Sequence, residues 1–190
     1  MDKKYNLVEI LFIGNSHTYV NDLPAIVQKI ASEDGYEADV VMIAHGGWYL
    51  KQHIQEPDIP FNIRYGHYDY VVLQEHSHPF DCIDDYREAA ATLVNWIRAA
   101  GSTPVIYGTW SMKAQEFEQA RMNQVNRELA DNLGAVLAPV RESWWTYMRS
   151  YPNLELYAED GAHASPQGSE YAAKIIWTSI RTDMARKKYR

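Results

Sequence analysis

Cysteine is nearly absent from this chain, since Cys82 is the only one among its 190 residues. An internal disulfide needs two cysteines, so packing and hydrogen bonds alone must hold the fold. A single cysteine is also typical of proteins from a reducing compartment. No apolar segment of signal-peptide length precedes the first expected strand, and no run approaches the length of a membrane span. We therefore expect a cytoplasmic protein without membrane association.

Positive charge is scarce as well. The chain has 18 lysines and arginines against 25 aspartates and glutamates, which gives a formal net charge of −7. A general nucleic-acid binder needs a basic face for phosphate contacts, so we expect no nucleic-acid partner. The one basic cluster, Arg181 to Arg190, falls at the end of an expected helix, where cations suit the helix dipole.

Five short apolar runs alternate with longer helical patterns along the chain. The runs are nearly continuously apolar, as strands covered on both faces should be. They are Val8–Ile13, Ala38–Ile43, Tyr70–Leu73, Pro104–Gly108 and Ala135–Ala138. Strands that alternate with helices form a parallel sheet. We therefore predict one α/β domain over residues 1–190, a three-layer α/β/α sandwich around a five-stranded parallel sheet.

The helices between these strands carry clear boundary signals. We expect Leu23–Ser32 after a capping Asp22, Tyr86–Ala100 before Gly101, and Glu116–Leu133 before Gly134. The last helix has Ser165 as its cap and Pro166 in its first turn, and it should run to about Arg186. Residues 55–67 and 144–159 have weaker patterns, which we interpret as irregular or partly helical rims of a cleft.

Polar and glycine-rich segments follow the strands, where an open parallel sheet collects its functional groups. These segments are Gly14-Asn15-Ser16, His45-Gly46-Gly47-Trp48, Gln74-Glu75-His76-Ser77-His78 and Thr109-Trp110-Ser111. A fifth, Asp160-Gly161-Ala162-His163, precedes the last helix. A serine hydroxyl becomes a nucleophile when an imidazole takes its proton and a carboxylate orients that imidazole. Ser16, His163 and Asp160 supply these three groups, so we predict a catalytic triad.

Two of these segments carry a resemblance to a known family. Gly14-Asn15-Ser16 and Asp160-Gly161-Ala162-His163 resemble the first and last blocks of the SGNH (GDSL-like) hydrolase superfamily, and the similarity spans essentially the whole chain. The resemblance implies a flavodoxin-like sheet, with Ser16 as nucleophile, His163 as base and Asp160 as its partner. It also implies an oxyanion hole built from the N–H groups of Ser16 and Gly47, with Gly46 as the alternative to Gly47.

The chain departs from this family at two places. Asn15 stands where the family usually has an aspartate that is outside the triad. The third block lacks its usual asparagine, an oxyanion donor, so we nominate Gln74, which carries the same amide on a longer stem. His76, Ser77 and His78 are the alternatives. Ordinary structural roles compete with each assignment, such as a helix cap for Ser16 and a tight turn for the two glycines.

These residues predict a serine hydrolase that cleaves an ester, most simply a small O-acyl group such as acetyl on a carbohydrate or related metabolite. Trp48, His78 and Trp110 are the expected substrate contacts, because aromatic faces suit a partly apolar ligand. The triad needs no cofactor, and none of the histidines shows the helical spacing of a zinc site. The alternatives are an acyltransferase on the same scaffold and a carbohydrate-binding module whose altered third block has cost activity.

Overall fold

A five-stranded parallel sheet forms the centre of the computed structural model, which describes residues 7–188. Its strands are β1 (Leu7–Gly14), β2 (Glu37–Ala44), β3 (Tyr70–Leu73), β4 (Thr103–Tyr107) and β5 (Val136–Ala138). They lie in the order β2-β1-β3-β4-β5. The five predicted strands are confirmed to within one residue at each end. After β1 the chain adds β2 on one side of it, and then adds β3, β4 and β5 on the other side. The carboxyl ends of β1 and β3 therefore flank a topological switch point.

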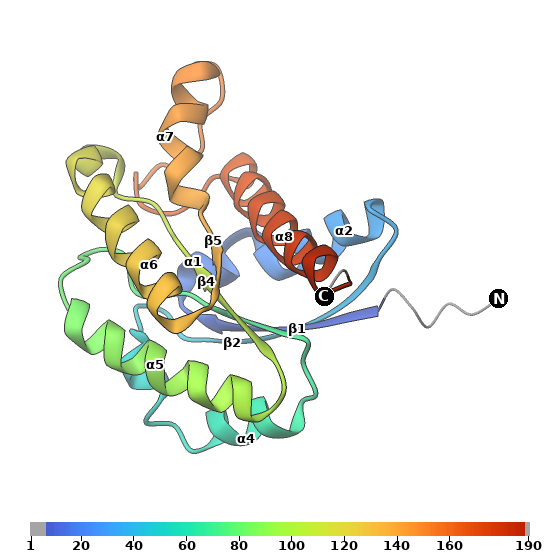
Figure 1. Cartoon of the computed structure of the whole chain (residues 1–190). Coiled ribbons are helices and arrows are strands. Elements are labelled where there is room, and N and C mark those ends of the chain that lie inside the picture. Colours follow the sequence, from blue (N-terminus) through green and yellow to red (C-terminus); the bar gives the residue numbers. More distant parts are fainter. Residues whose placement is uncertain (1–6, 189–190) are drawn as a thin grey trace.

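Helices cover both faces of the sheet and complete the predicted three layers (Figure 1). On one face lie α2 (Leu23–Glu33) and α8 (Pro166–Lys188), and on the other lie α4 (Asp58–Tyr65), α5 (Ile83–Ala99) and α6 (Gln119–Leu133). The elements that remain are α1 (Ser16–Tyr19), η2 (Val20–Asp22), α3 (Leu50–His53), η3 (Lys113–Glu118) and α7 (Val140–Ser150). None of the helices in residues 7–188 is both long and apolar enough to cross a bilayer.

The two cores are built from alternate residues of the same strands. In β1, Ile10 and Phe12 face the α2 and α8 side, whereas Leu11 and Ile13 face the α5 side, and all four are fully buried. A central parallel strand packs against helices on both of its faces, so nearly all of its side chains are apolar. Burial on both sides fixes the point at which β1 ends, and therefore where the following serine lies.

The helix boundaries follow the local signals with two exceptions. The Asp22 side chain accepts from Ala25 N, and Gly134 ends α6 with φ 58° in the left-handed region that glycine adopts freely. The first exception is the predicted helix Glu116–Leu133, which begins only at Gln119 as α6 because Gln115 leaves helical geometry. The second is the helix predicted to start at Tyr86, which begins at Ile83 as α5.

The two weakly patterned stretches contain more helix than expected. Residues 55–67 hold α4, in which Pro60 lies within the first turn, and residues 144–159 begin inside α7. The buried face of α7 includes Arg141, a polar residue that interrupts the apolar period and hides the helix from pattern analysis.

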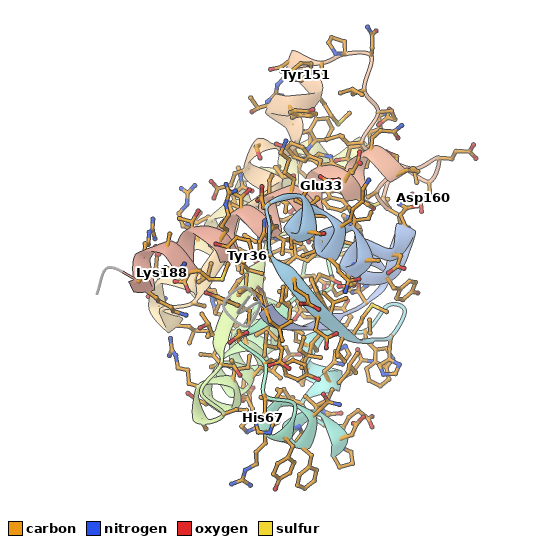
Figure 2. The ribbon with its side chains drawn as sticks, turned by 90° about the vertical axis from the view of Figure 1, so that its right-hand side faces the viewer. Glu33, Tyr36, His67, Tyr151, Asp160 and Lys188 are labelled. Atoms are coloured by element: carbon orange, nitrogen blue, oxygen red, sulfur yellow. The ribbon has the colours of Figure 1, made fainter. Side chains whose placement is uncertain are left out.

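The start of α8 is fixed against the segment before it. Tyr157 and Ala164 form an antiparallel bridge, Ser165 N donates to Leu156 O, and the Ser165 hydroxyl accepts from Gly168 N as a helix cap. The Asp160 loop is thereby held at the beginning of α8, at the opposite end of that helix from Lys188 (Figure 2).

Gly168 makes this junction possible, because a Cβ on it would lie 2.1 Å from Leu156 O. We expect Gly168→Ala to lower the free energy of unfolding by about 1–3 kcal/mol through overpacking against backbone that cannot move aside. Urea denaturation measures the change. Gln167→Ala, at the exposed neighbouring position, should leave the midpoint within experimental error. An equal effect of the two substitutions would show that Gly168 has no special packing role.

Candidate active site

Three side chains from opposite ends of the chain meet at the carboxyl edge of the sheet. Ser16 Oγ donates to His163 Nε2 at 2.8 Å, and His163 Nδ1 donates to Asp160 Oδ2 at 2.5 Å. The two hydrogen-bonded pairs lie 147 and 3 residues apart in sequence. The structure brings all three predicted triad residues into one hydrogen-bonded chain. This geometry allows the imidazole to take the serine proton while the carboxylate orients the ring.

Asp160 is held as an anion by its own loop. Its Oδ1 accepts from the backbone N–H groups of Ala162 and His163, each at 2.9 Å, while Oδ2 accepts from the His163 ring. The His163 hydrogen bond and then the Ala162 N–H bond lower the pKa of Asp160 to about 2. The carboxylate therefore stays ionised at neutral pH, although half of its side chain is exposed.

Ser16 occupies the turn directly after β1, as the first residue of α1. The first N–H groups of a helix have no partner within it, so the Ser16 N–H is free of helical bonding. The preceding residue fixes this turn: Asn15 Oδ1 accepts from His17 N at 3.1 Å, and its Nδ2 donates to Trp48 O at 2.9 Å. Asn15 thus ties the serine turn to the loop after β2, through an amide donor that an aspartate lacks.

Gln74 lies beneath this turn rather than facing it from the cleft. Its Oε1 accepts from Asn15 N at 2.8 Å and from Thr18 Oγ1 at 2.9 Å, and its Nε2 donates to Glu75 O. The side chain is 1% exposed. A Cβ on Gly14 would lie 2.6 Å from the same Gln74 oxygen, so glycine is needed at the close approach. This geometry favours a bracing role for Gln74 over the expected role as an oxyanion donor.

A histidine to which the sequence analysis assigned no role packs against the His163 ring. His17 stacks on His163, with ring centroids 5.0 Å apart and planes at 24°. It also meets the edges of His78 and Trp110. Burial, followed by the charges of the neighbouring histidines, lowers the pKa of His17 well below its ordinary value. The ring stays neutral and fixes the plane of His163. Its position next to Ser16 was the only signal available in the sequence.

Trp110 is placed differently from the expectation that it contacts substrate. Its side chain has no exposed surface, stacks on Trp144 with centroids 3.8 Å apart, and donates Nε1–H to Ala162 O at 2.8 Å. A completely covered ring offers no face to a ligand, so the geometry favours support of the Asp160–His163 loop from below.

The loop after β2 is bonded to the serine turn. Trp48 N donates to His45 O across a turn in which Gly47 has φ 73°, a left-handed conformation that glycine adopts without strain. The Trp48 ring is partly exposed and packs on His45 with centroids 4.1 Å apart. Since Asn15 holds Trp48 O, Gly47 is next to a residue bonded to the serine turn. Gly47 and Trp48 therefore lie beside the serine turn, and their roles in the oxyanion hole and in substrate binding stay predictions.

His78 differs from its neighbours in the third loop, because its ring nitrogen Nε2 is buried and has no partner among residues 7–188. By contrast, His76 Nδ1 contacts Pro79 O, and the Ser77 hydroxyl is paired with Thr109 Oγ1. Burial, with smaller contributions from His76 and His163, lowers the pKa of His78 to about 4. The ring is neutral at pH 7, so it can donate one N–H bond without carrying charge.

A cavity of about 170 Å³ opens beside His78. Ser77, Ser111 and Gln115 contribute hydrogen-bonding groups, while Phe80 and Met112 contribute apolar surface. Lys113, which follows Met112, donates its backbone N–H to Gly161 O in the triad loop. None of the three predicted triad residues lines this cavity, but the segment after Met112 is bonded to the loop that carries Asp160. In the part of the chain that the structure describes, no three potential ligands among His, Cys, Asp and Glu gather as a metal site.

Comparison with solved structures identifies the class of the protein. A protein from Slackia heliotrinireducens assigned to the SGNH hydrolases superposes with a TM-score of 0.78 and is 31% identical, over 92% of this chain and 100% of that one. An acetyl xylan esterase, AlAXEase, gives a TM-score of 0.76 at 14% identity, over 91% and 100% of the two chains. TesA gives 0.74 at 14% identity, over 92% and 98%.

The match at 31% identity spans nearly the whole chain. The two at 14% identity show the shared fold. No protein-family model and no curated protein sequence matches the chain. The likeness to the Slackia protein shows that this chain belongs to the SGNH hydrolase family, as the two sequence blocks predicted.

Removal of the Gln74 amide tests its role beneath the serine turn. We expect Gln74→Ala to lower the free energy of unfolding by about 1–3 kcal/mol, because Asn15 N–H is left buried without an acceptor. Denaturant titration measures the loss. Gln124→Ala removes an exposed amide bonded only to Glu128, and it should cost about 0.5 kcal/mol or less. Equal midpoints for the two variants would contradict the bracing role.

Proposed function

We propose that the protein is a serine esterase that removes a small acyl group through a covalent acyl-enzyme. The observation that carries this proposal is the continuous hydrogen-bonded chain from Ser16 through His163 to Asp160. His163 takes the proton of Ser16 as Oγ attacks the ester carbonyl, and Asp160 stabilises the imidazolium. The imidazolium then protonates the departing alcohol. A water molecule activated by His163 attacks the acyl-enzyme, which releases the acid and regenerates Ser16.

The tetrahedral intermediate places a negative charge on the former carbonyl oxygen. We assign the N–H groups of Ser16 and Gly47 as two donors to that oxygen. As the third donor we propose His78 rather than Gln74, because the Gln74 amide is committed to Glu75 O whereas His78 Nε2 is buried without a partner among residues 7–188. The assignment requires the Nε2–H tautomer of His78, in which a neutral imidazole donates to an oxyanion as an amide does.

The substrate we propose is an ester of a small acid with a polyhydroxylated alcohol such as a sugar. The cavity beside His78 has mixed hydrogen-bonding and apolar walls, and its volume of about 170 Å³ suits one compact group rather than a long chain. Trp48, whose carbonyl is bonded to Asn15 in the serine turn, presents a partly exposed aromatic surface. An acetyl xylan esterase among the structural neighbours agrees with this class of substrate.

Substitution of the nucleophile tests the reaction. We expect Ser16→Ala to lower kcat/KM for p-nitrophenyl acetate by at least about 10³-fold, since the attacking oxygen is gone. A fluorophosphonate probe should label the unmodified protein at Ser16 and leave the variant unlabelled. Ser150→Ala removes an exposed hydroxyl on α7 that bonds only Thr146 O, and it should retain full activity. Hydrolysis at the same rate by Ser16→Ala would remove this site from the reaction.

Two substitutions of His78 test the third donor. We expect His78→Ala to lower kcat by about 10²-fold with little change in KM, because the lost bond forms mainly in the transition state. His78→Asn retains an N–H donor and should recover a substantial part of that loss. His67→Asn, at an exposed position away from the cleft, serves as the matched control. Steady-state kinetics with p-nitrophenyl acetate measures all three. Full activity of His78→Ala would exclude the assignment.

A further inference from the structure

Glu75 is a buried carboxylate that the triad does not use. It follows Gln74 directly after β3, and it is 5% exposed. Its Oε2 accepts from Leu50 N, at the start of α3, at 3.2 Å, and its Oε1 accepts from the N–H of the next residue, His76, at 2.7 Å. No salt bridge reaches it within residues 7–188. Burial of an acid without a counter-ion lowers the stability of the fold, so the position of Glu75 calls for an explanation beyond packing.

The two bonds of Glu75 involve residues close in sequence to two of the proposed oxyanion donors. Leu50 comes three residues after Gly47, and His76 comes two residues before His78. The loop after β2 is also held at Trp48 O by Asn15 Nδ2. Its path is therefore fixed at two points, by Asn15 before the turn into α3 and by Glu75 at the start of that helix.

A pair of stacked rings also joins the loop after β2 to the loop after β3. Tyr49 and His76, the residues next to the two bonded N–H groups, stack with centroids 4.2 Å apart and planes at 19°. The loops after β2 and β3 thus meet through one carboxylate and one ring pair. Only the carboxylate is buried, so it sets the spacing between the two backbones.

From this arrangement, and on the basis of the function proposed above, we propose that Glu75 is a positioning residue. Its carboxylate holds the loop that carries Gly47 and the loop that carries His78 at the spacing that an oxyanion requires. Both oxygens are full acceptors only in the ionised form. A proton on either oxygen turns that atom into a donor and weakens one of the two backbone bonds, so the alignment depends on the charge state of Glu75.

The surroundings of Glu75 place this change of charge in an accessible pH range. Burial raises the pKa of Glu75 to about 7, against the lowering effect of the His76 and Leu50 N–H bonds. Asp85 on α5 raises the pKa further. The other titratable groups that face Glu75 are Tyr49, His76, Asp81, Cys82 and Tyr86. As pH falls through about 7, the carboxylate takes up a proton and the two loops lose part of their connection.

The glutamine variant separates this role from a merely structural one. At about pH 8.5 we expect Glu75→Gln to lower kcat for p-nitrophenyl acetate about tenfold, with KM changed less than about threefold. Glutamine offers one acceptor where two are needed. At about pH 5.5 the native Glu75 is itself protonated, so the ratio of the two kcat values should approach one. Glu88→Gln on α5 removes an exposed charge and should follow the unmodified protein at every pH.

Thermal unfolding gives a second readout that does not depend on catalysis. Because the folded-state pKa of Glu75 lies above its ordinary value, its contribution to stability is present at low pH and is lost as pH rises through about 7. Glutamine does not titrate. The Tm of Glu75→Gln relative to the unmodified protein should therefore increase between about pH 5 and pH 8, and that of Glu88→Gln should not.

The outcomes distinguish this inference from the proposed esterase. A kcat ratio that is constant with pH, or a Glu75→Gln variant as active as the unmodified protein, overturns the positioning role while Ser16→Ala still abolishes activity. Full activity of Ser16→Ala would instead overturn the proposed function. The Tm measurement remains informative in that case. If the Tm difference between Glu75→Gln and the unmodified protein stayed constant with pH, Glu75 would not titrate near neutral pH, and the positioning role would be overturned as well.

Discussion

The hydrogen bond between Ser16 and His163 depends on one constraint, the burial of β1 on both faces of the sheet. β1 is the second strand in space and the first in the chain, and its neighbours β2 and β3 continue the sheet in opposite directions. The serine turn therefore emerges at the switch point, where the loops after both neighbours converge on it. The triad loop reaches the same point because the bridge of Tyr157 with Ala164 and the capped start of α8 hold it there.

Around this point, the polar side chains at the ends of the strands hold the loops rather than face the solvent. Gln74 binds the serine turn from below, Asn15 binds that turn to Trp48 O, and Glu75 binds the loops after β2 and β3. Loop backbone lacks the regular hydrogen bonds of a sheet or helix, and side chains with several acceptors or donors can supply partners for its N–H and C=O groups. A preorganised set of donors is what the proposed reaction requires, since reorganisation during the reaction would cost rate.

Histidines occur throughout this site, and burial separates their roles. His17 and His78 are kept neutral by desolvation, whereas His163 is partly exposed and hydrogen-bonded to an ionised Asp160. The buried rings can pack or donate without competing for the proton that moves in the proposed mechanism. This division could not be read from residue types, because it follows from differences in solvent exposure among chemically identical side chains.

The sequence by itself determined the five strands, the helix ends at Asp22 and Gly134, and the identity of the groups that form the Ser16, His163 and Asp160 chain. These features depend on local periodicity, on turn chemistry and on a combination of residue types that suits proton transfer from a serine. Only the tertiary structure decided that Gln74 braces the serine turn, that Trp110 is covered, and that His17 stacks on His163. The direction of a side chain and the exposure of a ring depend on segments distant in sequence, which no local pattern encodes.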